Sequence, residues 1–279
     1  LGLCEPINRF RRAGITDRNA LAMPSLIKDL AGFFLGSAPA SSQARRPQST
    51  TPTQRDDKTD AKAWWWESRE ADRDVFKASR HRAHLPRCKR TGRPLKILAL
   101  HGRGSNNDIT SIQLSSLEVP TRCVADLLSA PRDSSPQSDV FHMLSNRSFH
   151  EWGHDEAALK GVLAYIEKYG PYDGLYGFSQ GAAVVTALSK PGVAEGFGSK
   201  RTWRFVICAC GVPPPGDGTV DLPSLQISGV RDPFRAASKA LADVYEAPVL
   251  LEHAGGHELP LKLRHDAKFK DALDAFFDR

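Results

Sequence analysis

The stretch Gly174-Leu-Tyr-Gly-Phe-Ser-Gln-Gly-Ala-Ala-Val184 decides the fold that this sequence predicts. Its centre, Gly177-Phe-Ser-Gln-Gly181, matches the pattern G-x-S-x-G. Apolar residues before the centre indicate the end of a buried strand, and small apolar residues after it indicate a helix that packs on a sheet. The chain must therefore reverse within about two residues at Ser179, a strained turn that directs the serine hydroxyl outward.

The surroundings of Ser179 suit a nucleophile. Gly177 and Gly181 have no Cβ atom that could collide with the neighbouring strand or helix. The N-terminus of the following helix brings free N–H groups close to the serine, which favours developing negative charge. Such a short pattern also arises by chance in loops containing Gly and Ser. The strand before it and the helix after it favour a nucleophile elbow.

Length and composition predict a globular α/β protein. With 279 residues, 41% of them hydrophobic, the chain can bury a full core, and a domain of roughly 180–250 residues accounts for most of it. No run approaches the roughly 20 apolar residues of a membrane span, which predicts a soluble protein. The net charge of +6 arises mainly before Pro94, and charges nearly balance from Leu95 onward. Nucleic-acid binding is therefore only a weak alternative.

The five cysteines bear on compartment and metal content. Their number is odd, and they show no C-x-x-C spacing. They fit reduced, mostly buried thiols better than a disulfide framework or a zinc site. We therefore expect a cytoplasmic protein without a metal. Residue 1 is Leu, which indicates a fragment or a processed chain, and an Arg/Ser-rich transit peptide would instead indicate an organelle.

The sequence predicts two segments before the folded domain. Residues 1–55, rich in Arg, Ser, Ala and Pro, are expected to be a disordered or targeting segment. Residues 56–93 form a charged extension with a possible helix over Asp60–Ser79. That helix would contain Trp64-Trp65-Trp66, which cannot share one face because neighbours lie about 100° apart. The extension is therefore expected to be a helix docked on the domain or, alternatively, a flap over an apolar pocket.

The predicted folded α/β domain covers residues 94–279, where strands and helices alternate. Besides the strand before Ser179, strands are expected at Lys96–Leu100, Arg122–Leu128, Trp203–Cys210, Leu222–Gly229 and Pro248–Glu252. Besides the helix after Ser179, helices are expected at Asp155–Tyr169, Phe234–Tyr245 and Leu261–Phe277. This order predicts a mainly parallel sheet flanked by helices, with functional loops at the carboxyl ends of the strands.

The segment between the second strand and the helix at Asp155 is expected to be loops. It begins with the Pro/Ser-rich stretch Ala130–Ser138 and continues through Phe141–Trp152, near the mouth of the site. His142, His150 and His154 lie here without convincing metal-ligand spacing. They are interpreted as surface or loop histidines.

A serine nucleophile needs a base within hydrogen-bond reach, and that base needs an orienting carboxylate. Behind a nucleophile elbow these groups follow in the order Ser, Asp or Glu, His, each on a loop after a strand. His257 lies in a Gly-Gly loop that can bring an imidazole over Ser179. It is favoured over His253 at the strand end and over His265 in the final helix.

The same order selects the acid. Asp232 stands just past a strand and before Pro233, which gives it a rigid platform. Asp217 and Asp221 lie in a Pro/Gly-rich loop and are interpreted as solvated loop charges. Asp232 is therefore the predicted partner of the base.

A second glycine-rich loop is the predicted oxyanion site. His101-Gly-Arg-Gly-Ser-Asn106 follows the first strand of the domain. Its backbone near Gly102 and Arg103 is expected to supply one N–H group, and Gln180 the other. The H-G-x-G pattern alone is weak, but its position before the elbow raises its value.

Four motifs together resemble the FSH family of serine hydrolases, an α/β-hydrolase group that includes carboxylesterases and polyketide-releasing thioesterases. The motifs are Gly170-Pro-Tyr-Asp-Gly174, Gly177-Phe-Ser-Gln-Gly-Ala182, Leu222-Pro-Ser-Leu225 leading to Asp232, and His253-Ala-Gly-Gly-His-Glu-Leu-Pro260. The resemblance covers roughly Pro94 to Arg279 and implies Ser179 as nucleophile, His257 as base and Asp232 as its partner. Two departures are Arg103, where an apolar residue is usual, and a short segment between Asn106 and Arg122.

The expected enzyme cleaves carboxylic esters or thioesters of small molecules through an acyl-enzyme on Ser179, without a cofactor. An acyl-protein thioesterase or lysophospholipase would use a similar elbow, but the G-G-H-x-x-P ending disfavours this alternative. A non-catalytic binding module of the same fold is the second alternative. The intact order of the three residue types argues against it.

Overall fold

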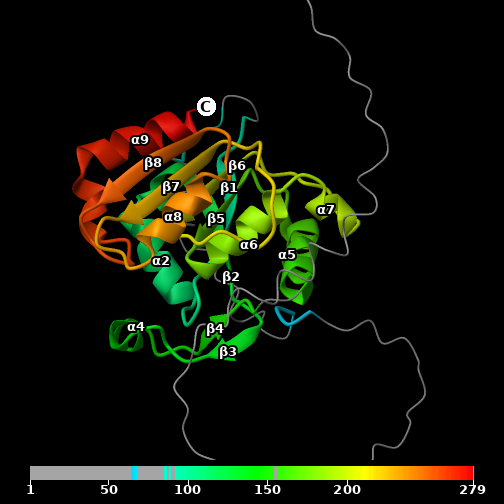
Figure 1. Cartoon of the computed structure of the whole chain (residues 1–279), viewed down its shortest axis with the longest axis horizontal. Helices are drawn as coiled ribbons and strands as arrows, with labels where there is room; N and C mark the ends of the chain where they lie inside the picture. The colour runs from blue at the N-terminus through cyan, green and yellow to red at the C-terminus, as the bar shows by residue number, and fades with distance from the viewer. Residues whose placement is uncertain (1–63, 68–84, 87, 89–91, 154–155, 279) are drawn as a thin grey trace, which may run out of the picture.

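The computed structural model describes residues 64–67, 85–86, 88, 92–153 and 156–278, so the segment 1–55 lies outside the described residues. Six strands form one sheet in the order β2-β1-β5-β6-β7-β8 (Figure 1). They are β1 (Leu95–Leu100), β2 (Cys123–Leu128), β5 (Gly174–Phe178), β6 (Phe205–Ala209), β7 (Ser224–Gly229) and β8 (Pro248–His253). All neighbouring pairs in this sheet are parallel, which confirms the predicted α/β fold.

Helices cover both faces of the sheet (Figure 1). On one face pack α5 (Glu156–Tyr169), α6 (Gln180–Ser189) and α8 (Arg235–Ala242), with α7 (Val193–Gly196) beside α6. On the other face pack α2 (Asn107–Ser116), α3 (Val119–Arg122), the 3₁₀ helix η4 (Leu261–His265) and α9 (Ala267–Phe277). The segment between Asn106 and Arg122 thus holds a ten-residue helix and a short turn of helix.

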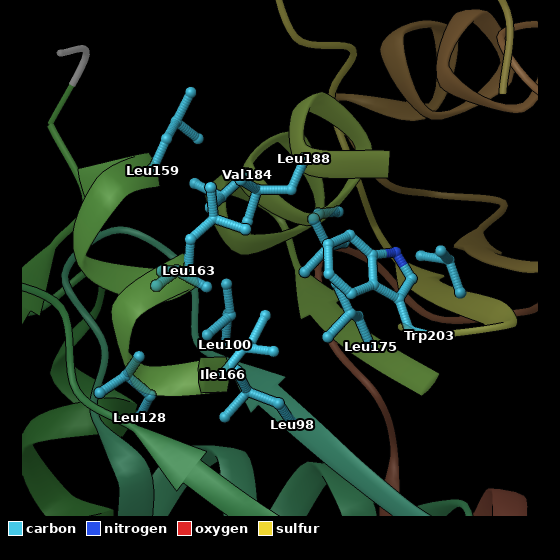
Figure 2. Close-up of a cluster of buried hydrophobic side chains, with 14 of the residues drawn as sticks. Leu98, Leu100, Leu128, Leu159, Leu163, Ile166, Leu175, Val184, Leu188 and Trp203 are labelled. Carbon is cyan, nitrogen blue, oxygen red and sulfur yellow. The ribbon is translucent and has the colours of Figure 1, made fainter. Parts of the chain in front are cut away.

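The two-sided core follows from the alternation of side chains along each buried strand. In β1, Leu98 and Leu100 face the α5/α6 layer, while Ile97 and Ala99 face the α2/α9 layer. Figure 2 shows the first of these clusters, in which sheet side chains meet those of α5 and α6. Its labelled residues are Leu98, Leu100, Leu128, Leu159, Leu163, Ile166, Leu175, Val184, Leu188 and Trp203.

The motif Gly170-Pro-Tyr-Asp-Gly174, which precedes Ser179, holds the N-terminal ends of the central strands together. Asp173 is buried and accepts a hydrogen bond of 2.8 Å from Lys96 N. Its carboxylate also pairs with Arg93 at 2.8 Å and with Arg204 at 3.1 Å. Burial opposes ionisation of Asp173, but the hydrogen bonds from Lys96 N and the two arginines outweigh it and lower its pKa. The residue therefore stabilises the register of β1 and β5.

The end of the chain differs from the prediction of one helix over Leu261–Phe277. The structure divides it into η4 and α9. The break falls at Asp266, whose side chain accepts hydrogen bonds from Lys268 N and Phe269 N and so caps α9. An apolar periodicity alone does not reveal this interruption, because Leu263 and Phe269 are buried on both sides of it.

The segment expected to be loops contains an antiparallel hairpin and a helix. Strands β3 (Arg132–Ser134) and β4 (Phe149–Glu151) pair, and α4 (Asp139–Leu144) lies between them. Figure 1 shows these three elements together outside the main helical layers. The surface interpretation of His150 is wrong: its side chain is buried and lies 3.2 Å from Asp133 through Nδ1. His142 belongs to α4, and His154 lies outside the described residues.

The described part of the tryptophan segment, Trp64–Glu67, is a turn rather than a helix. It packs on α5, where the Trp66 indole donates a 3.2 Å hydrogen bond to Gly161 O and contacts Tyr165 edge-on. The Trp65 indole donates to Ser129 O at 2.9 Å. The expected docking on the domain is thus seen for these residues, and the remainder of Asp60–Ser79 lies outside the described residues. No helix in the described part of the chain has the length and apolarity to cross a membrane.

Candidate active site

Ser179 occupies a strained turn between β5 and α6. Its φ and ψ are 51° and −114°, a conformation that non-glycine residues rarely adopt. The turn is held by a 2.9 Å hydrogen bond from Ser179 N to Ala209 O. A Cβ on Gly177 would lie 2.5 Å from backbone atoms of Ala182, so only glycine allows the helix to start this close to the strand.

Two loops from neighbouring strands bring His257 and Asp232 to this serine. His257 follows β8, and its Nε2 lies 3.0 Å from Ser179 Oγ. Asp232 follows β7, and its Oδ2 lies 2.9 Å from His257 Nδ1. The structure therefore brings together the three residues predicted as nucleophile, base and acid, at hydrogen-bond distances in that order.

The residues predicted as acid and base are shielded and oriented. The Asp232 side chain is fully buried, and its Oδ1 accepts a 2.7 Å hydrogen bond from Phe234 N. The His257 ring contacts two aromatic rings, with centroid distances of 5.2 Å to Phe178 and 5.1 Å to Phe234. Since one ring nitrogen faces a carboxylate, the proton is favoured on Nδ1, and Nε2 can accept the serine proton.

The histidines and the aspartate that the sequence disfavours as base and acid have partners other than Ser179. His253 is buried at the end of β8, and its Nδ1 accepts a 3.1 Å hydrogen bond from Gly255 N. His265 is exposed and accepts a hydrogen bond from Arg264 Nε. Asp221 pairs with Arg201 at 2.7 Å on the surface. His253 thus shapes the loop that carries His257.

The predicted oxyanion residues lie beside Ser179. Gly102 is so close that a Cβ there would lie 3.2 Å from Ser179 Cβ. Gln180 is the first residue of α6, where a backbone N–H has no partner within the helix. The Arg103 side chain is 73% exposed and pairs with Glu151 at 2.9 Å, so only its backbone is available as a donor in the hole.

Sequence reasoning missed Trp152 and Phe234. Trp152 follows β4, is fully buried and forms hydrogen bonds with Gln180 and His101. Phe234 is 51% exposed, and its ring contacts His257. No local pattern marks Trp152, because its partners are 28 and 51 residues away in the sequence. Phe234 could have been found from its place two residues after Asp232.

A polar cavity of about 360 Å³ lies next to the oxyanion loop, between the start of α2, the end of β2 and the hairpin. Its lining residues are Asn106, Asn107, Ser129, Asp133, Asn146, Arg147, Ser148 and His150. The lining does not include Ser179, Asp232 or His257, so the cavity is separate from the proposed reacting atoms.

One group among the described residues has metal-ligand chemistry. Ligand atoms of Cys210, Asp232 and His257 lie within 4.8 Å of one another. A metal at this point would need the Cys210 thiolate. Burial, reinforced by the negative charge of Asp232, raises the pKa of that thiol and so disfavours the thiolate. Asp232 and His257 are moreover already joined to each other.

Comparison with known proteins finds named esterases. Esterase FUS5 of Gibberella fujikuroi is 28% identical over 199 residues, covering 64% of this chain and 85% of the relative. Esterase OVCA2 of Xenopus tropicalis is 28% identical over 221 residues, covering 66% and 94%. Esterase OVCA2 of Bos taurus is 33% identical over 136 residues, covering 44% and 58%. A solved carboxylesterase from Mesorhizobium loti superimposes with a TM-score of 0.46 at 18% identity, covering 64% and 88%.

A comparison with family models covers a similar share of the chain. The family model described as serine hydrolase (FSH1) matches residues 90–269, which is more than half of the chain. The match includes Ser179, Asp232 and His257 and confirms the resemblance that the four sequence motifs predict. The chain belongs to the serine hydrolase (FSH1) family.

Proposed function

We propose that this protein hydrolyses carboxylic esters of small molecules through an acyl-enzyme on Ser179. The observation that carries the proposal is the hydrogen-bonded series Ser179 Oγ–His257 Nε2 (3.0 Å) and His257 Nδ1–Asp232 Oδ2 (2.9 Å). Relatives named esterases support an ester as the substrate class. Thioesters undergo the same acyl transfer, so the choice between esters and thioesters as substrates is a separate question that kinetics must decide.

In the proposed reaction, Ser179 Oγ attacks the carbonyl carbon while its proton passes to His257 Nε2. The carbonyl oxygen becomes negatively charged and accepts hydrogen bonds from Gln180 N–H and from the Gly102–Arg103 backbone. Collapse of this intermediate expels the alcohol or thiol, which takes the proton from His257. Water then attacks the acyl-enzyme by the same route and releases the acid. Asp232 holds the imidazole in the required tautomer and stabilises its cation.

Labelling with a fluorophosphonate probe tests the nucleophile and the base. We expect the wild type to become covalently labelled, and Ser179→Ala and His257→Ala to lose the label. Circular dichroism should show that both variants remain folded. A folded wild type that stays unlabelled would contradict the proposal and favour the non-catalytic binding module. A panel of esters and thioesters of increasing acyl length then separates ester from thioester preference. Acyl-protein and lysophospholipid substrates test the remaining alternative.

A further inference from the structure

We propose that Trp152 is a positioning residue that fixes the two backbone segments of the oxyanion hole relative to each other. The inference rests on the proposed function, because it concerns the donors assigned there to the transition state. Trp152 follows β4 and is fully buried, although the hairpin that carries it lies apart from the main sheet. It therefore connects the hairpin to the catalytic loops.

Two hydrogen bonds from Trp152 reach the two sides of the proposed hole. Its backbone N donates to Gln180 Oε1 at 3.0 Å, on the side of the elbow helix. Its indole Nε1 donates to His101 O at 2.8 Å, on the side of the loop after β1. One rigid, buried residue thus spans the residue that follows the nucleophile and the residue that precedes Gly102.

The bond to His101 O fixes the direction of a catalytic donor. A trans peptide is planar, so its C=O and its N–H point in opposite directions. The His101 carbonyl belongs to the same peptide as Gly102 N–H. With the carbonyl held by Trp152, Gly102 N–H is directed away from the indole.

A second bond does the same for the next peptide. The His101 ring Nε2 accepts a 2.9 Å hydrogen bond from Ala130 N, which places the ring proton on Nδ1. His101 Nδ1 then donates to Gly102 O at 2.7 Å. This carbonyl shares its peptide with Arg103 N–H, which is thereby directed away from the ring. The His101 ring itself packs against Trp152, at a centroid distance of 5.5 Å.

The loop after β1 and the turn at Ser179 pack closely against each other. A Cβ on Gly102 would lie 3.2 Å from Ser179 Cβ, and one on Gly181 would lie 2.6 Å from His101 O. Because these segments are already in van der Waals contact, a displacement of His101 shifts the donors relative to Ser179. Donors stabilise an oxyanion only when they lie about 2.7–3.1 Å from its position, and losing one lowers kcat about 10²–10³-fold.

The test is Trp152→Phe, which keeps a buried ring and removes the indole N–H. Its matched control is Trp203→Phe, because Trp203 is equally buried and donates to Ser189 Oγ at 2.8 Å, outside the proposed hole. We expect Trp152→Phe to lower kcat about 10–100-fold with KM changed less than about threefold. Affinity for a trifluoromethyl ketone, which forms a tetrahedral oxyanion adduct with serine, should fall by a similar factor. Trp203→Phe should lower the melting temperature without either effect.

The outcomes separate this inference from the proposed function. A wild type that neither hydrolyses esters nor reacts with fluorophosphonate contradicts the proposed function itself. An active wild type with Trp152→Phe kinetics equal to those of Trp203→Phe contradicts only the role of Trp152. If Trp152→Phe does not fold, Gln180→Met removes the acceptor of the Trp152 backbone N–H and keeps the Gln180 backbone donor. We expect a lower kcat and weaker ketone binding there as well, and unchanged values in this variant overturn the inference.

Discussion

The Nδ1 atom of His257 lies 2.9 Å from Oδ2 of Asp232, and the Asp232 side chain is completely buried. A buried carboxylate accepts from the imidazole and stabilises the cation that forms when the ring takes a proton. An amide in its place can present its NH₂ group, which favours the tautomer with the proton on the nitrogen facing Ser179. The contact between these two residues therefore decides whether Nε2 can act as a base.

Asp232→Asn is accordingly expected to lower kcat about 10³–10⁴-fold with a small change in KM. The fold should persist, because Asn Oδ1 can still accept from Phe234 N. Steady-state hydrolysis of a short acyl ester measures the effect. Asp221→Asn is the control, since Asp221 pairs with Arg201 on the surface and should leave kcat unchanged. Equal activity of the two variants would mean that the acid lies elsewhere.

Gly181→Ala should damage both stability and activity. A Cβ at this position would collide with the carbonyl oxygens of Leu100 and His101. The loop after β1 must then move away from the elbow, and we expect kcat to fall at least about tenfold. Gly256→Ala is the control, because the nearest atom to its Cβ would be Arg231 O at 3.9 Å, an ordinary contact. Thermal melting and ester hydrolysis distinguish the two variants. A Gly181→Ala protein with wild-type kinetics would contradict the close approach of loop and elbow.

The buried His253 should make the protein less stable in acid. Burial lowers its pKa, against the opposing charges of Glu258 and Asp232, while Lys262 acts in the same direction as burial. A histidine whose folded pKa lies below the unfolded value of about 6.5 binds protons more readily in the unfolded chain. Its contribution to stability is therefore present above pH 6.5 and is lost as the pH falls through the folded pKa.

His253→Asn tests this contribution, because Asn can accept from Gly255 N and does not titrate in this range. Urea unfolding of both proteins at pH 8 and pH 5.5 gives the free energy of unfolding in each case. We expect the wild type to lose more stability between the two pH values than the variant. Equal losses would place the acid sensitivity in other groups.

The elbow, the sheet and the order of the three site residues were predictable, because each depends on a local pattern. The strand segment Val206–Ala209 is continuously buried. A Cβ atom on Gly177 or Gly181 would collide with neighbouring backbone atoms, so the turn around Ser179 requires glycine at both positions. The loops that carry Asp232 and His257 each follow a strand, and the apolar residues of these strands made the strands predictable. The distances between the three side chains, in contrast, required the structure.

The hairpin from Arg132 to Glu151 was not predictable from periodicity. Its strands have three residues each, which is too short for a clear alternation. Helix α4 has six residues, and its apolar residues Val140, Met143 and Leu144 are exposed, so its composition does not mark a face that packs on the core. What holds the hairpin is a set of long-range polar contacts, including the Ser105–His150 backbone pair and the Trp152 hydrogen bonds. Contacts of this kind leave no signal in a single sequence.

The docking of Trp65 on α5 can be tested by the sign of one substitution. In a helix interior, Gly→Ala normally stabilises by about 1 kcal/mol. At Gly161, however, the new Cβ would overlap the ring of Trp65, whose indole also donates to Ser129 O. Gly161→Ala should therefore displace Trp65 and lower the free energy of unfolding. In a Trp65→Ala background the same change should raise it, by up to about 1 kcal/mol.

Urea unfolding of the four proteins in this cycle measures the coupling between residues 65 and 161. Stabilisation by Gly161→Ala in both backgrounds would contradict the docked position of Trp65.

Ester hydrolysis by the same proteins tests the hypothesis that the extension is a flap. The contacts of Trp65 given above lie at Gly161 and Ser129, and neither is a proposed site residue. We therefore expect unchanged kcat and acyl-length preference in Gly161→Ala, because loss of the docked ring alters stability and leaves Ser179, His257 and Asp232 in place. A changed acyl-length preference would instead support the flap.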